Sequence, residues 1–393
     1  MRSLIVGASK DIKYGCKLLK KENVRSIALD GNEKAEGFSF SEEHLVVDIS
    51  KENKCIKVAN ELAIDFILPV PIGRFITTWG AINDELNLKG ISKEMAEVCT
   101  DKWTFHQLLN KNSLRNAQAY LIDNSEVKLK NLTFPMILKP RFGSGSRNVM
   151  LIKNEDQLQN EIKNFDFQAD NFILETAISG VEFGVDALVI NGAFKMVLLR
   201  EKINTPPPNR QAIGYFSQHD ASQFPNLHHK VQQKLKDVIE CLGLNNCLLH
   251  ADVMVNEEDE FIIELSPRPS GHNLHNNFTI KATGFDMLKT YIEFQKSEKY
   301  SLDIPNLKNV ALLYFDFENV QFIDVPSNEE IMALDNIIEA NINIKNGDIR
   351  RIISQGSDVI NDGFVIIEGN DRDRIWAKYD EVKRKFKVKE VFI

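Results

Sequence analysis

The chain has 393 residues, which exceeds one ordinary hydrophobic core and predicts two or three domains. Hydrophobic residues make up 43% and charged residues 26%, as in globular proteins, and the formal net charge of -8 argues against general nucleic-acid binding. No apolar run approaches the roughly 18 residues of a membrane span, and we read no signal peptide before the first strand-like run. Five scattered cysteines without a C-x-x-C pair suit reduced thiols. We therefore expect a cytoplasmic protein without nucleic-acid or membrane partners.

Short apolar strands alternate with helical segments over residues 1–95. The expected elements are, in order, a strand at 4–6, a helix through Leu18 and Leu19, and strands at 26–30 and 66–70. This alternation predicts an α/β fold that begins with a doubly wound parallel sheet. The turn Gly7-Ala8-Ser9 lacks the full G-x-G-x-x-G fingerprint, so the sequence favours a scaffold with substrate contacts at its strand ends over a dinucleotide site. Beyond the sheet, Asp101 can cap a helix over 102–109, whose N-terminus would favour an anion.

A β-hairpin with a glycine-serine tip is predicted next. The buried strand 134–140 carries Lys139, and the strand resumes at 149–152 after a polar loop. Backbone N–H groups and hydroxyls at such a tip could bind phosphates, although the loop lacks the ending and the following helix of a Walker loop. A plain flexible hairpin tip is the alternative. The residues concerned are Ser144, Gly145 and Ser146 within the loop 141–148.

Two further strands are predicted on either side of a bend at Gly180. The first apolar strand ends at Glu175, and the second begins at Glu182. The backbone of the linker could pair with the edge of an adenine, and Glu182 could accept hydrogen bonds from ribose hydroxyls. Solvated acids at strand ends are the alternative.

Two carboxylates face one spot in a second predicted hairpin. Apolar runs flank the turn-prone segment 256–260, and the register could bring Asp252 opposite Glu264. Such hard oxygen ligands suit Mg²⁺, which usually takes one or two protein carboxylates and fills its other positions with water and nucleotide phosphates. Arg268, four residues beyond Glu264, offers a rigid fork of donors to a phosphate or a carboxylate. Two surface acids and a surface arginine are the alternative.

Several basic side chains could complete a site. Either the basic residues around the proline-rich loop bind an anionic acceptor, or they form a solvated basic loop; they are Arg200, Lys202 and Arg210. His272 and His275 either orient a substrate or contact a metal, or they are plain hydrogen-bonding residues of a Gly-Asn loop.

The segment from about residue 300 onward predicts structural support. It opens with the apolar run 310–315 and ends in an amphipathic helix from about Arg372 to Phe386. The turn signal Asn361-Asp362-Gly363 indicates a hairpin before the strand 364–367. No constellation of acid with His or of Cys with His is visible there.

Taken in chain order, these residues resemble the ATP-grasp superfamily, in its carboxylate-amine ligase branch. The motif Ser266-Pro267-Arg268-Pro269 is similar to formate-dependent glycinamide ribonucleotide transformylase, whereas His250-x-Asp252 and the segment 270–273 look more like the L-amino-acid ligases. The resemblance spans nearly the whole chain and implies three parts. These are a Rossmann-like N-terminal domain over 1–95, a two-lobed ATP-grasp domain over 100–295 with a lid at about 115–172, and a smaller α+β C-terminal domain over 300–393.

The resemblance also implies a role for each residue that matches the family motifs. Lys102 and Lys139 would contact the phosphates of ATP, together with the lid loop of Ser144, Gly145 and Ser146. Glu175 to Ile178 would face the adenine, and Glu182 would accept from the ribose. Asp252 and Glu264 would bind Mg²⁺ or Mn²⁺; Ser266 stands where the family often has Asn, and its shorter reach leaves direct metal contact open. Arg268, with Lys139, would act on the reacting carboxylate and its acyl phosphate.

The function expected from the resemblance is an ATP-dependent ligase of a small-molecule carboxylate and a small-molecule amine, which releases ADP and phosphate. Two alternatives stay open: a carboxylase-type enzyme that uses carboxyphosphate, and a non-catalytic ATP-binding module. The resemblance also allows a homodimer. The identities of the acid and the amine do not follow from the residues.

Overall fold

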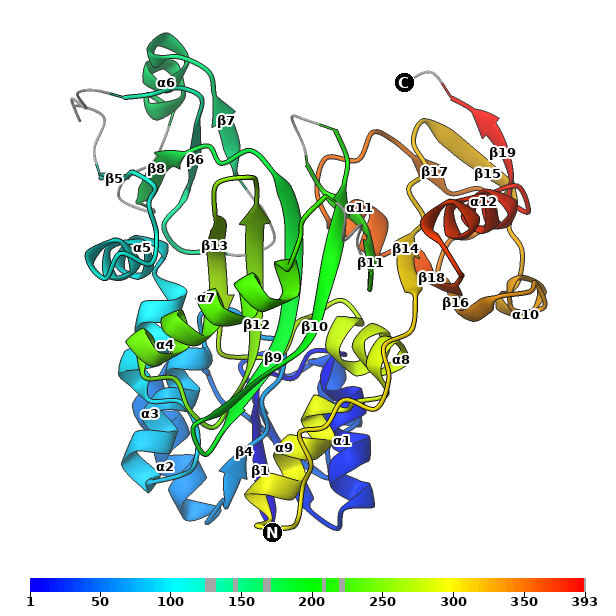
Figure 1. The fold of residues 1–393 in the computed structure, drawn as a ribbon. Helices are drawn as coiled ribbons and strands as arrows, with labels where there is room; N and C mark the ends of the chain where they lie inside the picture. The colour runs from blue at the N-terminus through cyan, green and yellow to red at the C-terminus, as the bar shows by residue number, and fades with distance from the viewer. Residues whose placement is uncertain (124–131, 144–147, 165–170, 207–209, 219–222, 392–393) are drawn as a thin grey trace.

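A parallel sheet opens the structure. The computed structural model describes residues 1–123, 132–143, 148–164, 171–206, 210–218 and 223–391. Its first sheet has the strand order β3-β2-β1-β4, with helices packed around it (Figure 1). In chain order the elements are β1 (Arg2–Val6), α1 (Ile12–Lys21), β2 (Arg25–Asp30), η1 (Glu36–Ser39), β3 (Glu43–Val46), α2 (Glu52–Glu61), β4 (Phe66–Ile67), α3 (Ile76–Leu86) and α4 (Lys93–Thr100). The predicted α/β start is confirmed, although β4 ends at Ile67, shortly before Pro69, and is shorter than the strand expected at 66–70.

A separate antiparallel sheet occupies the segment predicted as a lid. Its strand order is β5-β8-β6-β7, and it lies at the top of Figure 1. The elements are α5 (Lys102–Lys111), β5 (Ala119–Ile122), β6 (Met136–Pro140), β7 (Met150–Ile152), α6 (Glu155–Ile162) and β8 (Phe172–Thr176). Leu138, Leu158 and Leu174 belong to a small core of this lobe alone. The predicted hairpin is confirmed as the pair β6 and β7, whereas its tip at 144–147 lies outside the described residues.

An eight-stranded sheet forms the centre of the molecule, in the order β13-β12-β9-β10-β11-β14-β18-β16. Its elements are β9 (Val181–Ile190), β10 (Ala193–Asn204), β11 (Ala212–Phe216), α7 (Leu227–Leu242), β12 (Cys247–Val255), β13 (Glu260–Ser266), β14 (Val310–Tyr314), β16 (Ile337–Ile342) and β18 (Gly363–Glu368). Side chains alternate between the two faces of a strand. One face of β9 and β12 is therefore apolar, with Phe183 and Val253 in the same core as Val231 and Leu235 of α7. The other face carries a row of polar residues.

Two polar contacts join helix α1, beside the parallel sheet, to the helical segment that follows β13. The connecting elements are η2 (Leu274–Phe278), which is a π-helical turn, α8 (Thr279–Thr283) and α9 (Met287–Gln295). The hydroxyl of Tyr14 donates to Asp286 at 2.6 Å, and Lys296 lies 2.9 Å from Glu22. The first sheet is thus held against α9. Within the described ranges, no helix has both the length and the apolar character needed to cross a membrane.

The C-terminal segment continues the main sheet. Because β14 pairs with β11 and with β18, the sheet runs unbroken across the boundary predicted near residue 300. The remaining elements are β15 (Val320–Asp324), α10 (Asn328–Met332), β17 (Ile349–Arg350), α11 (Ser357–Ile360), α12 (Arg372–Lys383) and β19 (Lys387–Glu390). The expected C-terminal helix is confirmed as α12. The hairpin expected at 361–363 is wrong, since Asn361 is the C-cap of α11 and Gly363 begins β18, whose partners β14 and β16 are joined to it by longer segments.

One ion pair fixes α12 to the back of β10. Glu201 accepts two hydrogen bonds from Arg372, at 2.7 and 2.8 Å, and the guanidinium carbon of Arg372 lies 4.5 Å from the ring centroid of Phe216. Because side chains alternate along a strand, Arg200 and Lys202 point to the opposite face of β10. The C-terminal segment therefore supports the strand that carries both cations.

Replacement of Gly180 by Ala should destabilise the fold more than a backbone preference alone explains. Gly180 has φ of +152°, and a Cβ there would lie 2.2 Å from the carbonyl oxygen of Val255, which is backbone and cannot step aside. We expect a loss of roughly 2 kcal/mol or more in the free energy of unfolding, measured by urea denaturation. Gly192→Ala is the matched control: it has φ of +77° with nothing within 4 Å, and should cost only about 1 kcal/mol. Equal losses in the two variants would contradict the clash.

Candidate functional site

Asp252 and Glu264 lie directly opposite each other on the polar face of the main sheet. They are register partners in β12 and β13, as predicted, and a bulge follows Asp252. Like charges in this position destabilise a sheet unless a cation lies between them. Within the described ranges, no group of three or more His, Cys, Asp and Glu side chains is placed to hold a metal ion by itself. A pair of carboxylates is nevertheless what Mg²⁺ needs when nucleotide phosphates complete its shell. Ser266, two residues further on, is 7% exposed and pairs with His250.

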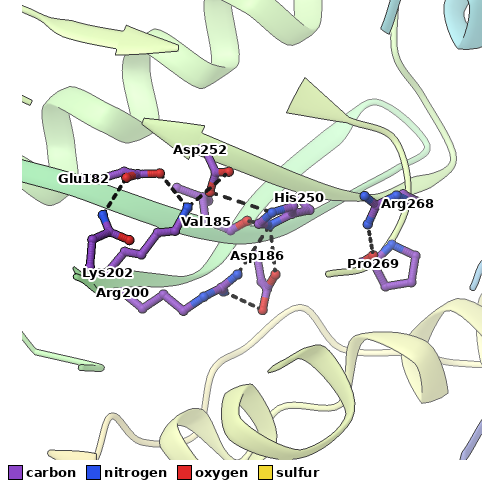
Figure 2. A network of polar contacts seen from close by, with 10 residues as sticks. Glu182, Val185, Asp186, Arg200, Lys202, His250, Asp252, Arg268 and Pro269 are labelled. Carbon is purple, nitrogen blue, oxygen red and sulfur yellow. Dashed lines mark hydrogen bonds and ion pairs between the residues drawn. The ribbon is translucent and has the colours of Figure 1, made fainter. Parts of the chain in front are cut away.

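Lys202 stands between the acids of two strands (Figure 2). Its ammonium lies 2.5 Å from Glu182 and 3.8 Å from Asp252. Burial alone would lower the pKa of Lys202, but Asp252 and Glu182 together raise it well above its usual value. The structure places Lys202 in β10, two residues before the end of the strand that leads into the proline-rich loop. A cation next to the facing acids offsets part of their repulsion.

Glu182 is held on both oxygens of its carboxylate. Lys202 donates to Oε1 at 2.5 Å, and Asn204 donates to Oε2 at 2.7 Å. A carboxylate has about four lone-pair positions, so two acceptor positions remain. The expected role of Glu182 as a ribose acceptor stays a prediction, now with an orientation fixed by two neighbours.

Arg200 is fully buried beside Asp186, whereas the sequence suggested that it lies around the proline-rich loop. Its guanidinium lies 2.7 Å from the carboxylate of Asp186, which also accepts from Thr279 at 2.5 Å, and both ionic side chains are 0% exposed. Of the two alternatives for Arg200, the solvated basic loop is wrong, because the side chain is fully buried; binding of an anionic acceptor stays a prediction. Figure 2 shows His250 between this pair and Asp252, with its Nε2 3.8 Å from Asp252.

Gly184 makes room for the Arg200 guanidinium. A Cβ at Gly184 would lie 3.0 Å from Nε of Arg200, which is closer than nearly all real contacts. The spacing Glu182-Phe183-Gly184-Val185-Asp186 therefore puts an acid, a gap and a second acid on one face of β9. A glycine inside a strand is the signal that could have indicated this close approach from the sequence.

Glu175 lies at the centre of three basic side chains. Its carboxylate is 2.6 Å from Lys139, 2.9 Å from Arg115 and 3.0 Å from Nδ1 of His106. Burial alone would raise the pKa of Glu175, but Lys139, His106 and Arg115 hold it well below its usual value. The carboxylate of Glu175 is thus engaged mainly by these three neighbours, and the adenine-facing role of 175–178 stays a prediction. The roles of Arg115 and His106 were missed, since neither stands in a recognisable motif.

Lys102 reaches the hairpin that carries Lys139. Its ammonium donates to the carbonyl of Gly143 at 2.7 Å, at the edge of the loop whose residues Ser144, Gly145 and Ser146 lie outside the described residues. Asp101 caps α5 as predicted, through the N–H of Trp103 at 3.1 Å, and also binds Arg141 at 2.5 and 2.7 Å. Helix α5 and the strand end of β6 are thus joined where the hairpin loop begins.

Arg268 follows β13 and retains unused donors. One nitrogen donates to the carbonyl of Pro269 at 2.9 Å, and Nε has no hydrogen-bond partner within the described ranges. Burial lowers the pKa of Arg268 below its usual value, against the opposing charges of Glu264 and Asp252. The guanidinium therefore stands within the electrostatic reach of the facing acids and can accept an anionic group.

The two histidines of the loop after Arg268 differ in exposure. His275 is 4% exposed, and its Nδ1 contacts the carbonyl of Ser270, as the plain hydrogen-bonding alternative predicts. His272 is exposed, has φ of +57°, and accepts from the hydroxyl of Tyr314 through its backbone carbonyl at 3.0 Å. Of the two, only the side chain of His272 is open to a ligand.

Comparison with known proteins bears on this arrangement. Residues 132–276 match the family model described as an ATP-grasp domain. The chain is 22% identical over 314 residues to an alanine–anticapsin ligase of Bacillus amyloliquefaciens. The match covers 72% of this chain and 64% of the ligase, so this chain spans less than two thirds of the ligase's length. An L-amino acid ligase from Bacillus licheniformis superposes with a TM-score of 0.81 at 14% identity, over 100% of this chain and 99% of the other. A phosphoribosylglycinamide synthetase from Anaerococcus prevotii does so with a TM-score of 0.76 at 22% identity, over 99% of both chains. The predicted resemblance and fold class are confirmed.

The buried pair of Asp186 and Arg200 predicts a defined dependence of stability on pH. Burial alone would raise the pKa of Asp186, but Arg200, His250 and Thr279 hold it below its usual value. The ionised form therefore stabilises the fold above the unfolded pKa of about 4, and this contribution is lost as the pH falls toward the lower folded pKa. Asp186→Asn leaves Arg200 buried without an anion and should cost about 3 to 5 kcal/mol at neutral pH.

Urea midpoints at about pH 7 and at about pH 4 and below measure this effect. The wild-type chain should lose more stability on acidification than Asp186→Asn does. The exposed Glu85→Gln variant is the control and should behave as the wild type. An identical acid response in Asp186→Asn and wild type would show that Asp186 does not carry the effect.

Proposed function

We propose that this chain, which carries an ATP-grasp domain, is an ATP-dependent carboxylate-amine ligase that forms an amide or peptide-like bond through an acyl phosphate and releases ADP and phosphate. The observation that supports it most is the facing pair of Asp252 and Glu264 with Arg268 beyond the end of the same strand. This set unites acids for a divalent cation with a guanidinium for an anionic substrate. A protein that only binds nucleotide has no need of the guanidinium.

The chemistry requires a carboxylate to be made electrophilic, because a free carboxylate resists attack by an amine. Transfer of the γ-phosphoryl group of ATP to a carboxylate oxygen breaks the bond between the γ-phosphorus and its bridging oxygen, and gives an acyl phosphate and ADP. Attack by the amine then expels phosphate and forms the amide. The task of the protein is mainly to position and neutralise. Lys102 and Lys139 would neutralise phosphate charge, and the donors of Arg268 would hold the acyl-phosphate oxygens.

The facing acids fit a divalent cation. Asp252 and Glu264 are partners on one face of the sheet and repel each other unless a cation intervenes. Mg²⁺ would be held by these two carboxylates, and Mn²⁺ by the same oxygens; either would supply charge neutralisation at the phosphates. Ser266 is nearly buried at the end of β13, on the same face of the strand as Glu264, so its hydroxyl would be the next oxygen of β13 available to the cation.

Screening of small acids paired with small amines tests the proposal. A productive pair should release ADP and phosphate in step with a product whose mass equals acid plus amine minus water. Arg268→Lys keeps the charge but loses the two-pronged geometry, so its turnover should fall on the order of a hundred-fold while ATP affinity stays nearly intact. Coupled ADP assays and mass spectrometry of the same reaction give both readings.

Other products would point elsewhere. AMP with pyrophosphate would contradict the acyl-phosphate route. Release of ADP that requires bicarbonate, and no other acid, would favour the carboxylase-type alternative. Normal turnover of Arg268→Lys would remove the role given to that side chain.

Two variants should separate binding from chemistry. Lys139→Ala should weaken binding of Mg-ATP by about ten-fold or more, since a buried phosphate-facing cation is lost. Glu264→Gln retains an oxygen but not the charge, so we expect turnover to fall far more than ATP affinity. Isothermal calorimetry and steady-state rates measure the two quantities. Glu257→Gln, an exposed acid in the turn of the same hairpin, is the control; unchanged ATP affinity in Lys139→Ala would overturn the assignment.

A further inference from the structure

Glu175 and Lys139 are diagonal neighbours on one face of the lid sheet. Ile137 is the register partner of Glu175, and Lys139 is the partner of Ile173, so the two charged side chains lean toward each other across β6 and β8. Their oxygen and nitrogen atoms lie 2.6 Å apart, and the side chains are only 5% and 6% exposed. Because the pair is almost fully buried, the carboxylate of Glu175 fixes the direction of the Lys139 ammonium.

The same carboxylate is joined to the other wall of the site through Arg115, with His106 beside it. Arg115 donates to Glu175 with one nitrogen, at 2.9 Å, and to the carbonyl of Ile262 with another, also at 2.9 Å. His106 lies between the same two groups, with Nδ1 3.0 Å from Glu175 and Nε2 3.3 Å from the carbonyl of Ile263, and a neutral imidazole can donate to only one of them. Both carbonyls belong to β13, directly before Glu264. Glu175 thus connects Lys139 in the lid sheet with the strand that bears the second facing acid.

The cluster of Glu175, Arg115, Lys139 and His106 carries more positive than negative charge. Burial lowers the pKa of His106 below its usual value, which favours the neutral imidazole. Arg115 and Lys139 then face the single negative charge of Glu175. An ammonium has three N–H donors, and one of them is taken by Glu175, so two remain for an incoming anion. Lys139 is therefore held by Glu175 and still has two N–H donors for an anion.

We propose that Glu175 is a positioning residue that sets the direction of Lys139 and couples it, through Arg115, to strand β13, rather than a side chain that contacts the adenine. This inference rests on the proposed function in one respect, which is that Lys139 binds a nucleotide. The carboxylate of Glu175 contacts three basic neighbours, so the adenine would be recognised by other groups. The spacing between the lysine and the facing acids is therefore fixed by buried contacts within the protein.

Binding of Mg-ATP and Mg-GTP to a set of variants tests the proposal by calorimetry. Glu175→Gln keeps the shape and removes the charge, so Lys139 loses its acceptor and is repelled by Arg115; ATP affinity should fall about ten-fold. The ratio of GTP to ATP affinity should stay as in the wild type, because no contact to the base is removed. In a Lys139→Met background, the added Glu175→Gln change should have little further effect.

Glu175→Asp guards against a failure of Glu175→Gln to fold. It keeps the negative charge but is one methylene shorter, so it cannot hold Lys139 and Arg115 together, and ATP affinity should again fall with the base ratio unchanged. Glu155→Gln, an exposed acid on α6 of the same lobe, is the control and should bind as the wild type.

Each contrary result has a distinct meaning. Wild-type chain that fails to bind Mg-ATP would overturn the proposed function and this inference together. With wild type binding normally, three results would overturn this inference alone: unchanged or tighter ATP binding in Glu175→Gln and Glu175→Asp, a changed base ratio, or an undiminished Glu175→Gln effect in the Lys139→Met background. The last would mean that Glu175 acts on the fold in general and not through Lys139.

Discussion

The mutual repulsion of Asp252 and Glu264 is the constraint around which the polar face of the main sheet is organised. Antiparallel pairing brings the two carboxylates together, and the sheet tolerates them because cations gather nearby. Lys202 stands between Asp252 and Glu182, and Arg268 follows at the end of β13. The apolar face of the same strands packs on α7, so the charged row cannot turn away from the site without exposing the core.

The strands and their register were predictable where the pattern is local. The alternating apolar runs around 256–260 were enough to place Asp252 opposite Glu264, because a short turn leaves few possible registers. The hairpin of Lys139 and the bend at Gly180 followed from similar signals. The tight turn expected at 361–363 failed for the opposite reason: a favourable dipeptide does not say which strand lies beside it, and β18 pairs with strands more distant along the chain.

The partners of the buried charges were not predictable, because they come together only in the folded chain. Arg200 was expected in a basic loop, yet it is enclosed with Asp186, and the Thr279 that shares this acid is distant in sequence. Arg115 and His106 carry no motif, and they meet Glu175 because α5 and the segment after it lie against β5, the partner of β8. A sequence shows that a charged residue stands in an apolar run; which opposite charge allows it to stay there is a property of tertiary packing.

The grip of Arg372 on Glu201 makes the C-terminal segment part of the back wall of the site. Glu201 lies between Arg200 and Lys202 in sequence and faces away from both, so the pair with Arg372 holds from behind the very stretch of β10 that presents two cations in front. The last hundred residues therefore cannot be exchanged as an independent module. A foreign C-terminal segment would have to supply both the next strand of the sheet and a guanidinium at this point, or the cations of β10 would lose their alignment.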